Sequence, residues 1–249
     1  MQSVMIIKNV KVFTEDKTFE PGAIGIENGI FKNNLFDSGE IIDGEGCYAI
    51  PGLIDVHFHG CMGYDFCDGT KEAIEKIAEY EASQGVTTIV PATMTLSEEE
   101  LMKIMANGGT YENKEGAAVL AGINMEGPFI CSKKKGAQAA THIHKPDVAM
   151  FRRLQEAANG LIRLVDIAPE VEGAMEFISE LKDEVHISFA HTTADYDTAK
   201  TGYALGACHA THLYNAMPPF THREPGVIGA ARDSRSEEHT SELQSHTSI

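Results

Sequence analysis

The sequence predicts an α/β fold: an incomplete parallel (β/α)8 TIM-type barrel of about six βα units, preceded by a small β-sandwich domain. Three observations lead to this prediction. Residues 1–50 consist of short β-branched runs separated by turns. From Pro51 onward, apolar strands alternate with segments of helical periodicity, which is typical of a parallel sheet. Histidine and glutamate residues stand at the ends of several of these strands, where the active sites of barrels lie.

Residues 1–50 are expected to form the small β domain. Its expected strands are 4–7, 10–13, 23–26 and 30–33. Asn28-Gly29 between the last two runs is the dipeptide that favours a tight hairpin, because both residues tolerate positive φ.

Residues 51–233 are expected to form the partial barrel. Its expected strands are 53–59, 87–91, 119–125, 161–167, 186–190 and 207–213. One helix is predicted to begin after Thr70 as N-cap and to end at Gly85. Ser97 and Glu100 form a capping-box pattern that predicts the start of another.

The length of the chain predicts that two βα units are missing, because about 180 residues follow the β domain whereas a full barrel takes about 250. Residues 234–249 lose the apolar periodicity and are expected to be a non-native or disordered tail. The run from Arg235 resembles the in-frame translation of a DNA-sequencing adapter; a natural disordered tail is the alternative. On either interpretation, His239 and His246 are not expected to be ligands.

Composition narrows the class of partners. The formal net charge of −17 disfavours nucleic acid and acidic membranes, because the field of the protein repels polyanions. The five cysteines show no C-x-x-C pair or framework spacing, which predicts reduced thiols and a cytoplasmic location. The sequence contains no long apolar span and no signal-peptide pattern at Met1, so we expect a soluble protein.

Two histidines give the strongest chemical signal. His57 and His59 alternate on a predicted strand and therefore project to the same side. An H-x-H pair alone is weak evidence, since two polar residues on a half-exposed strand give the same pattern. Three further residues follow predicted strands: Glu126, His191 and His212. By itself, each histidine could be an ordinary core or surface residue, and the glutamate could simply be solvated. Four imidazoles and one carboxylate at the same rim of the barrel, however, suit zinc or iron.

The sequence resembles the N-acetylglucosamine-6-phosphate deacetylases of the amidohydrolase superfamily over nearly the whole chain before the tail. The motifs that carry the resemblance are P-G-L-I-D-V-H-F-H-G from Pro51, M-E-G-P-F from Met125, K-G-A-Q from Lys135, A-H-T from Ala190, H-L-Y-N-A-M-P-P from His212 and H-R-E-P-G from His222. The first motif marks only the superfamily, whereas the combination of the others is specific.

The resemblance implies the roles of individual residues. Glu126, His191 and His212 would hold the main metal ion, and His57 and His59 a second one bridged by Glu126. The substrate would contact Ala137, Gln138, Asn215, Ala216 and Arg223. Some relatives carry histidine in place of Gln138. Arg223 also has a physical rationale, because a guanidinium fork binds phosphate bidentately and the acidic protein as a whole does not.

The expected reaction is metal-dependent hydrolysis of the acetamide of N-acetylglucosamine 6-phosphate to glucosamine 6-phosphate and acetate. The family's catalytic aspartate stands at the end of the eighth strand, and no strand is expected here after Ala231. Asp55 and Asp233 do not fit the role, so the catalytic residue is unknown and the chain is expected to be inactive.

Two other interpretations stay open. The chain could be an inactive, truncated metal-binding fragment, or it could be another amidohydrolase such as a dihydroorotase. The partners implied by the resemblance are a small amino-sugar phosphate and, in the full-length protein, a second copy in a homodimer.

Overall fold

The computed structural model describes residues 4–32, 38–234 and 237–238. It divides into two compact units, Met1–Gly52 and Leu53–Ile249. Their boundary falls two residues beyond the one expected from the sequence.

The N-terminal unit is one mixed sheet. Its strands are β1 (Val4–Phe13), β2 (Phe19–Glu27), β3 (Ile30–Lys32), β4 (Glu40–Asp43) and β5 (Tyr48–Ala49). The order is β3-β2-β1-β4, with β5 also paired to β1; β2 is antiparallel to its neighbours, and β4 and β5 run parallel to β1. The runs predicted at 4–7 and 10–13 form a single strand with an irregularity between Ile7 and Val10. The described residues show one layer, so the expected sandwich is not confirmed.

The predicted hairpin is confirmed. Asn28 and Gly29 have φ values of 52° and 76° and connect β2 to β3. Of the predicted strand 30–33, residue Asn33 lies outside the described residues.

The second unit is built on parallel strands. They are β6 (Leu53–Asp55), β9 (Val86–Ile89), β10 (Val119–Leu120), β11 (Ile123–Met125), β12 (Ile162–Ile167), β13 (His186–Phe189), β14 (His209–Ala210) and β15 (Glu237–Glu238). One sheet has the order β10-β9-β6 and the other β11-β12-β13-β14-β15. A parallel bridge between Ala92 and Asn124 connects the two. A short antiparallel pair, β7 (Gly60–Cys61) and β8 (Tyr64–Asp65), follows β6.

Three strand predictions need correction. The strand predicted at 53–59 ends at Asp55, and the one predicted at 207–213 covers only His209–Ala210. The strand predicted at 119–125 is broken between Leu120 and Ile123 into β10 and β11. Contrary to expectation, a two-residue strand, β15, follows Ala231 and pairs with β14. The described part of the chain contains no pairing of β15 with β6, so a closed barrel is not present in it.

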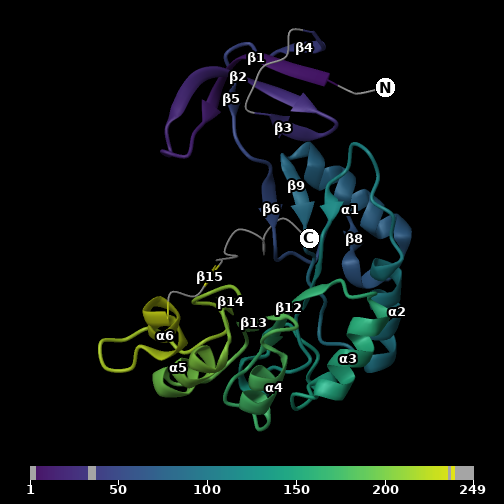
Figure 1. The fold of residues 1–249 in the computed structure, drawn as a ribbon. Helices are drawn as coiled ribbons and strands as arrows, with labels where there is room; N and C mark the ends of the chain where they lie inside the picture. Colours follow the sequence, from purple (N-terminus) through teal and green to yellow (C-terminus); the bar gives the residue numbers. More distant parts are fainter. Residues whose placement is uncertain (1–3, 33–37, 235–236, 239–249) are drawn as a thin grey trace. The chain divides into compact units, whose positions relative to one another are not determined.

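Helices connect the strands in sequence order. They are α1 (Lys71–Ser83), α2 (Glu98–Gly109), α3 (Val148–Ala157), α4 (Ala174–Leu181), α5 (Tyr196–Leu205) and α6 (Gly226–Ser234). Figure 1 shows them following one another along the outer side of the curved row of strands. Both predicted helix starts are confirmed, because Thr70 accepts from the Ala73 amide and Ser97 exchanges both capping-box hydrogen bonds with Glu100.

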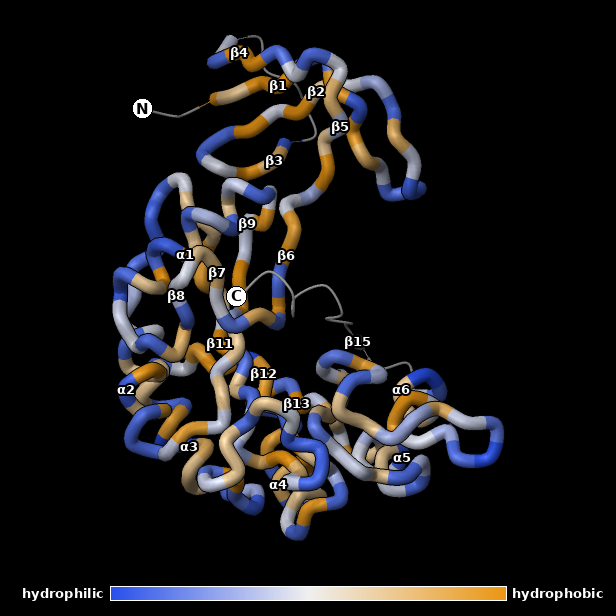
Figure 2. Tube along the Cα trace, turned by 180° about the vertical axis from the view of Figure 1, so that it is seen from behind, coloured by the Kyte–Doolittle hydropathy of each residue, from blue (hydrophilic) through white to orange (hydrophobic). Residues whose placement is uncertain are grey.

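The apolar faces of the helices pack on the strands and make one continuous core. Hydrophobic and hydrophilic segments alternate along α3 and α4 in Figure 2, as expected for helices with one buried face. Phe177 of α4 lies against Phe129, whose ring centroid is 5.2 Å away, and against Phe151 of α3 at 5.9 Å. Since Phe129 follows Glu126 by three residues, this aromatic cluster supports the loop after β11.

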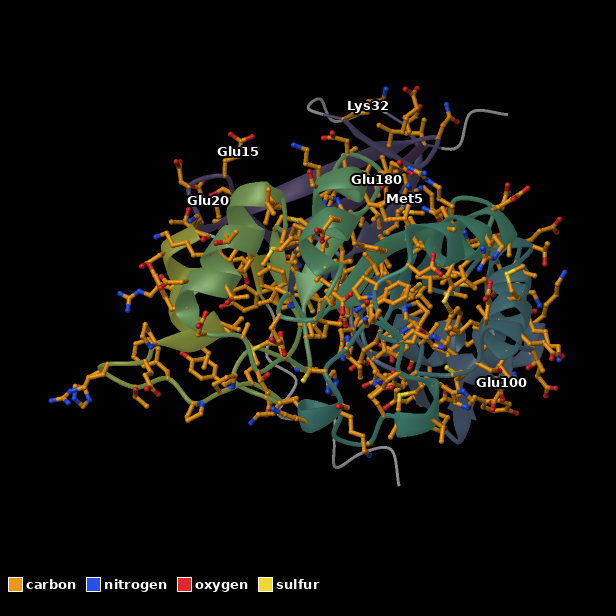
Figure 3. All side chains as sticks on the ribbon, turned by 90° about the horizontal axis from the view of Figure 1, so that it is seen from below. Met5, Glu15, Glu20, Lys32, Glu100 and Glu180 are labelled. Atoms are coloured by element: carbon orange, nitrogen blue, oxygen red, sulfur yellow. The ribbon has the colours of Figure 1, made fainter. Side chains whose placement is uncertain are left out.

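Several acidic side chains lie at the surface, where water solvates their charge. Glu15, Glu20 and Glu100 are exposed and extend outward from the ribbon in Figure 3. None of the helices in the described residues is long and apolar enough to cross a membrane.

Replacing Phe177 with alanine should lower the free energy of unfolding by about 3–5 kcal/mol, because a cavity replaces a buried ring that contacts two others. The measurement is chemical denaturation followed by circular dichroism. Glu180→Ala, on the exposed face of the same helix, should change stability by no more than about 0.5 kcal/mol. Equal effects of the two substitutions would contradict the packing role of Phe177.

Candidate metal centre

The ends of four parallel strands bring five polar side chains together. His57 and His59 follow β6, Glu126 follows β11, His191 follows β13 and His212 follows β14. Glu126, His57, His191 and His212 are buried, and His59 is half-buried. Each of the four histidines has its Nε2 atom within 3.7 Å of a carboxylate oxygen of Glu126.

The two carboxylate oxygens of Glu126 face different histidines. Oε1 lies 2.7 Å from His191 Nε2 and 3.4 Å from His212 Nε2. Oε2 lies 3.1 Å from His59 Nε2 and 3.7 Å from His57 Nε2. One carboxylate therefore stands between two pairs of imidazoles.

The two pairs also contact each other. His57, Glu126 and His212 each offer one ligand atom, and these atoms lie within 4.8 Å of one another. The rings of His57 and His212 are 5.6 Å apart and nearly perpendicular. The five residues are thus a single cluster and not two separate sites.

Backbone carbonyls orient three of the four imidazoles. The Nδ1 atoms of His59, His191 and His212 lie 3.2, 2.8 and 3.1 Å from the carbonyl oxygens of Ala92, Lys134 and Asn215, respectively. A carbonyl can only accept, so each neutral ring carries its proton on Nδ1 and presents the lone pair of Nε2 toward Glu126. This is the arrangement found for histidines that bind metal ions.

His57 has a side-chain partner instead. Its Nδ1 lies 3.1 Å from Asn124 Nδ2, while the buried Asn124 Oδ1 lacks a hydrogen-bond partner among the described residues. The oxygen and nitrogen of an asparagine amide are assigned from the hydrogen-bond network. With the atoms as assigned, Asn124 Nδ2 also donates to the carbonyl of Val56 at 3.4 Å.

The buried negative charge of Glu126 favours a bound cation. Burial alone would raise the pKa of Glu126, but hydrogen bonds from His191, His212 and His59, with the charge of His57, lower it well below its ordinary value. Oε2 is buried, with His59 Nε2 at 3.1 Å and His57 Nε2 at 3.7 Å. A buried carboxylate ringed by nitrogen lone pairs fits a divalent cation, and the donor set of imidazoles and one carboxylate is that of catalytic zinc sites.

Two loops carry residues expected to contact the substrate. Gly136, next to Ala137, packs on the His191 ring, since a Cβ there would lie 3.5 Å from Cε1. Ala137 is exposed, whereas Gln138 is buried and its Oε1 accepts from the Thr95 amide at 2.6 Å. Gln138 therefore also has a structural role that the sequence did not reveal.

Asn215 and Ala216 lie three and four residues after His212. The Nδ2 atom of Asn215 is buried without a partner among the described residues, so it is a donor available to a ligand. Ala216 has a φ of 52°, and its carbonyl accepts from the amide of Thr192. These contacts join the loops after β13 and β14.

Arg223 lies in a different part of this face. It is exposed and lines a cavity of about 580 Å³ between residues 193–197 and 218–226. Thr193, two residues after His191, lines the same cavity. The cavity therefore connects the segment that follows His191 with the guanidinium group.

Sequence reasoning missed several supporting residues. Lys134 is half-buried, its carbonyl orients His191, and its Nζ donates to Met217 O at 3.1 Å. Glu170 binds the loop after His191. Neither has a local sequence signal, because both contacts depend on which loops the fold places side by side.

A buried polar network lies on the same strands. Thr211 Oγ1 donates to Asp166 Oδ1 at 2.7 Å, Ser188 Oγ lies 2.7 Å from Thr211 Oγ1, and His209 Nδ1 lies 2.8 Å from Ser188 Oγ. Burial and the nearby charge of Glu126 raise the pKa of Asp166 to about 8. Burial thus favours the neutral form of Asp166 beside the negative charge of Glu126.

Comparison with known proteins identifies the protein family of this chain. The chain belongs to the amidohydrolase family, whose model matches residues 48–235. Within that family, the chain is similar to N-acetylglucosamine-6-phosphate deacetylases. It is 35% identical to the one from Bacillus subtilis (strain 168) over 242 residues, covering 93% of this chain and 61% of the relative, and 32% identical to the one from Homo sapiens over 241 residues, covering 92% and 58%. The chain thus spans about three fifths of the length of these curated relatives.

Solved structures agree. The enzyme of this name from Pasteurella multocida matches with a TM-score of 0.86 at 25% identity, covering 95% of this chain and 64% of that one. A variant from Mycobacterium smegmatis, in complex with N-acetyl-D-glucosamine-6-phosphate, matches with a TM-score of 0.84 at 28% identity, covering 96% and 63%. A dihydroorotase structure matches with a TM-score of 0.52 at 13% identity, which shows a shared fold alone.

Protons should compete with metal ions for His59. Burial by itself would lower the pKa of His59, but the hydrogen bond and charge of Glu126 outweigh it and raise the pKa above 6.5. His59 is then largely protonated below that pH, so zinc affinity should rise as the pH increases from about 6 to about 8. His59→Asn should reduce this slope by about one proton per zinc ion bound. Competition with a chromophoric chelator measures both, and identical slopes would contradict the role of His59.

Proposed function

We propose that the protein to which this chain belongs hydrolyses the acetamide of N-acetylglucosamine 6-phosphate to glucosamine 6-phosphate and acetate. The support is the similarity to deacetylases of that name over at least nine tenths of the chain, as in the relatives from Bacillus subtilis and Homo sapiens. We also propose that the second unit is part of the (β/α)8 barrel of this family, with the remaining βα units outside the described residues, and that a sandwich completes the N-terminal sheet.

The observation that carries the proposal is the position of Glu126 between two histidine pairs. We propose zinc or iron as the cation, one or two per protein. His191 and His212 with Glu126 Oε1 would hold one ion, and His57 and His59 with Oε2 a second. When bound, a divalent cation supplies Lewis-acid activation of the amide carbonyl and a nucleophile at neutral pH.

The surrounding residues would position the substrate. Arg223 would bind the phosphate in the cavity that it lines with Thr193, and the unpaired Nδ2 of Asn215 would donate to a sugar oxygen. Ala216 and Ala137 would form walls beside the ligand loops. Gln138 has its Oε1 engaged and only a long contact from Nε2 to Met94 sulfur, so its amide nitrogen is the atom available to substrate.

The proposed reaction also needs a carboxylate that acts as general base and general acid. Asp55 accepts from its own neighbour, the amide of His57, at 3.0 Å, and Asp233 accepts from the Tyr196 hydroxyl at 2.6 Å. Neither is therefore arranged to exchange protons with an amide nitrogen. We propose that this group lies outside the described residues and that the 249-residue chain by itself is inactive.

We also propose a cytoplasmic location and a homodimeric full-length protein. The support for the location is that none of the five cysteines forms a disulfide.

The protein in its natural full length should release acetate from N-acetylglucosamine 6-phosphate, lose this activity on chelation and regain it with zinc or iron. The 249-residue chain should be slower by at least about 10²-fold, the typical contribution of an acid–base group. Acetate release is measured enzymatically. If the full-length protein instead opened a cyclic imide and released no acetate, it would be a dihydroorotase-like enzyme; equal rates of the two forms would place the acid–base group within this chain.

In the full-length protein, Arg223→Ala should reduce kcat/KM for the phosphorylated sugar by about 10- to 100-fold, since hydrogen bonds to a charged group contribute about 1.5–3 kcal/mol. Arg223→Lys should recover only part of the loss, because an ammonium group lacks the bidentate fork. N-acetylglucosamine without phosphate is the control and should react equally with all three proteins. A proportional loss on both substrates would contradict phosphate recognition by Arg223.

A further inference from the structure

Glu170 binds the segment that follows the ligand His191. It lies three residues after the end of β12 (Ile162–Ile167), the strand that separates β11 from β13. Its Oε2 accepts from the Thr192 hydroxyl at 2.5 Å, and its Oε1 accepts from the amide and hydroxyl of Thr193 at 2.6 and 2.9 Å. One side chain thus receives three hydrogen bonds from two consecutive residues.

The backbone at His191 needs external support. Its φ is 46°, a left-handed conformation that is unfavourable for residues with a Cβ atom. The imidazole is nevertheless held closely, with Nδ1 2.8 Å from Lys134 O and Nε2 2.7 Å from Glu126 Oε1. Relaxation of φ at this residue would move the ring away from both contacts.

Three loops restrain this backbone. The His191 carbonyl accepts from the amide of Cys131, and the Thr192 amide donates to the carbonyl of Ala216. Both of these are neutral backbone hydrogen bonds. Glu170 adds charge-assisted hydrogen bonds, which are stronger, and it does so from the one strand between β11 and β14 that supplies no ligand.

We infer that Glu170 is a positioning residue of the metal centre: it holds Thr192 and Thr193 so that His191 keeps its left-handed backbone and directs Nε2 at Glu126. The inference rests on the proposed metal centre. Because Thr193 also lines the cavity with Arg223, the same carboxylate fixes one wall of the substrate pocket relative to the metal ligands.

Zinc affinity of the 249-residue chain, measured by competition with a chromophoric chelator, tests the inference without requiring activity. Glu170→Ala should bind zinc about 10- to 100-fold more weakly, the usual loss when an outer-shell partner is removed. Glu170→Gln should restore most of the affinity, because its Oε1 can still accept from the amide and hydroxyl of Thr193.

Asp147→Ala is the matched control for stability. Asp147 caps α3 by accepting from the Met150 amide at 3.0 Å, away from the ligand loops. Its removal should lower the melting temperature and leave zinc affinity unchanged. If Glu170→Ala does not fold, Thr192→Val is the second variant. It removes one of the three hydrogen bonds to Glu170, together with the hydrogen bond that the Thr192 hydroxyl accepts from the Ala194 amide. It should weaken zinc binding by at least about 2-fold, the lower end of the net value of one hydrogen bond.

Three results would overturn the inference: zinc affinity unaltered in Glu170→Ala, no recovery in Glu170→Gln, or unaltered affinity in Thr192→Val where alanine prevents folding. Failure of the unaltered chain to bind zinc would overturn the metal centre and this inference with it. Normal binding by both the unaltered chain and Glu170→Ala would overturn the inference alone.

Discussion

The buried charge of Glu126 is the constraint on which the rest of the second unit depends. A carboxylate that is 2% exposed costs several kcal/mol of desolvation unless positive or donor groups compensate it. Four imidazoles surround it, two beside each oxygen, and compensate the charge when they are protonated or when they share a cation with the carboxylate. They come from three different strand ends, so the compensation exists only when the parallel strands are in register. The metal-binding arrangement and the fold are therefore coupled.

The proximity of the four histidines to Glu126 was predictable because strand ends are a feature of local sequence. His191 and His212 each follow an apolar run, and the parallel order of β11, β13 and β14 brings these run ends to one edge. The predicted strands were too long where they included His57, His59 and His212. These residues leave the ladder so that their rings turn toward Glu126, a tertiary requirement that periodicity does not express.

The groups that orient the ligands were not predictable. The carbonyls of Ala92, Lys134 and Asn215 fix three imidazole tautomers, and a carbonyl has no residue type by which a sequence could reveal it. Gln138 shows the opposite limit. The resemblance implied that Gln138 contacts the substrate. Its side chain also accepts a hydrogen bond from the amide of Thr95, which is 43 positions away in the chain.

Several residues in the loops of the candidate site have positive φ values. His191, His212 and Ala216 all have left-handed backbones, which local sequence disfavours for residues with a Cβ atom. Such conformations persist only where surrounding contacts over-determine them, and they concentrate at functional sites. Here the loops after β11, β12, β13 and β14 hydrogen-bond to one another around the ligands. The hydrogen bonds between these loops thus offset the backbone strain at His191 and His212. The same hydrogen bonds hold the imidazoles in the geometry that a cation requires.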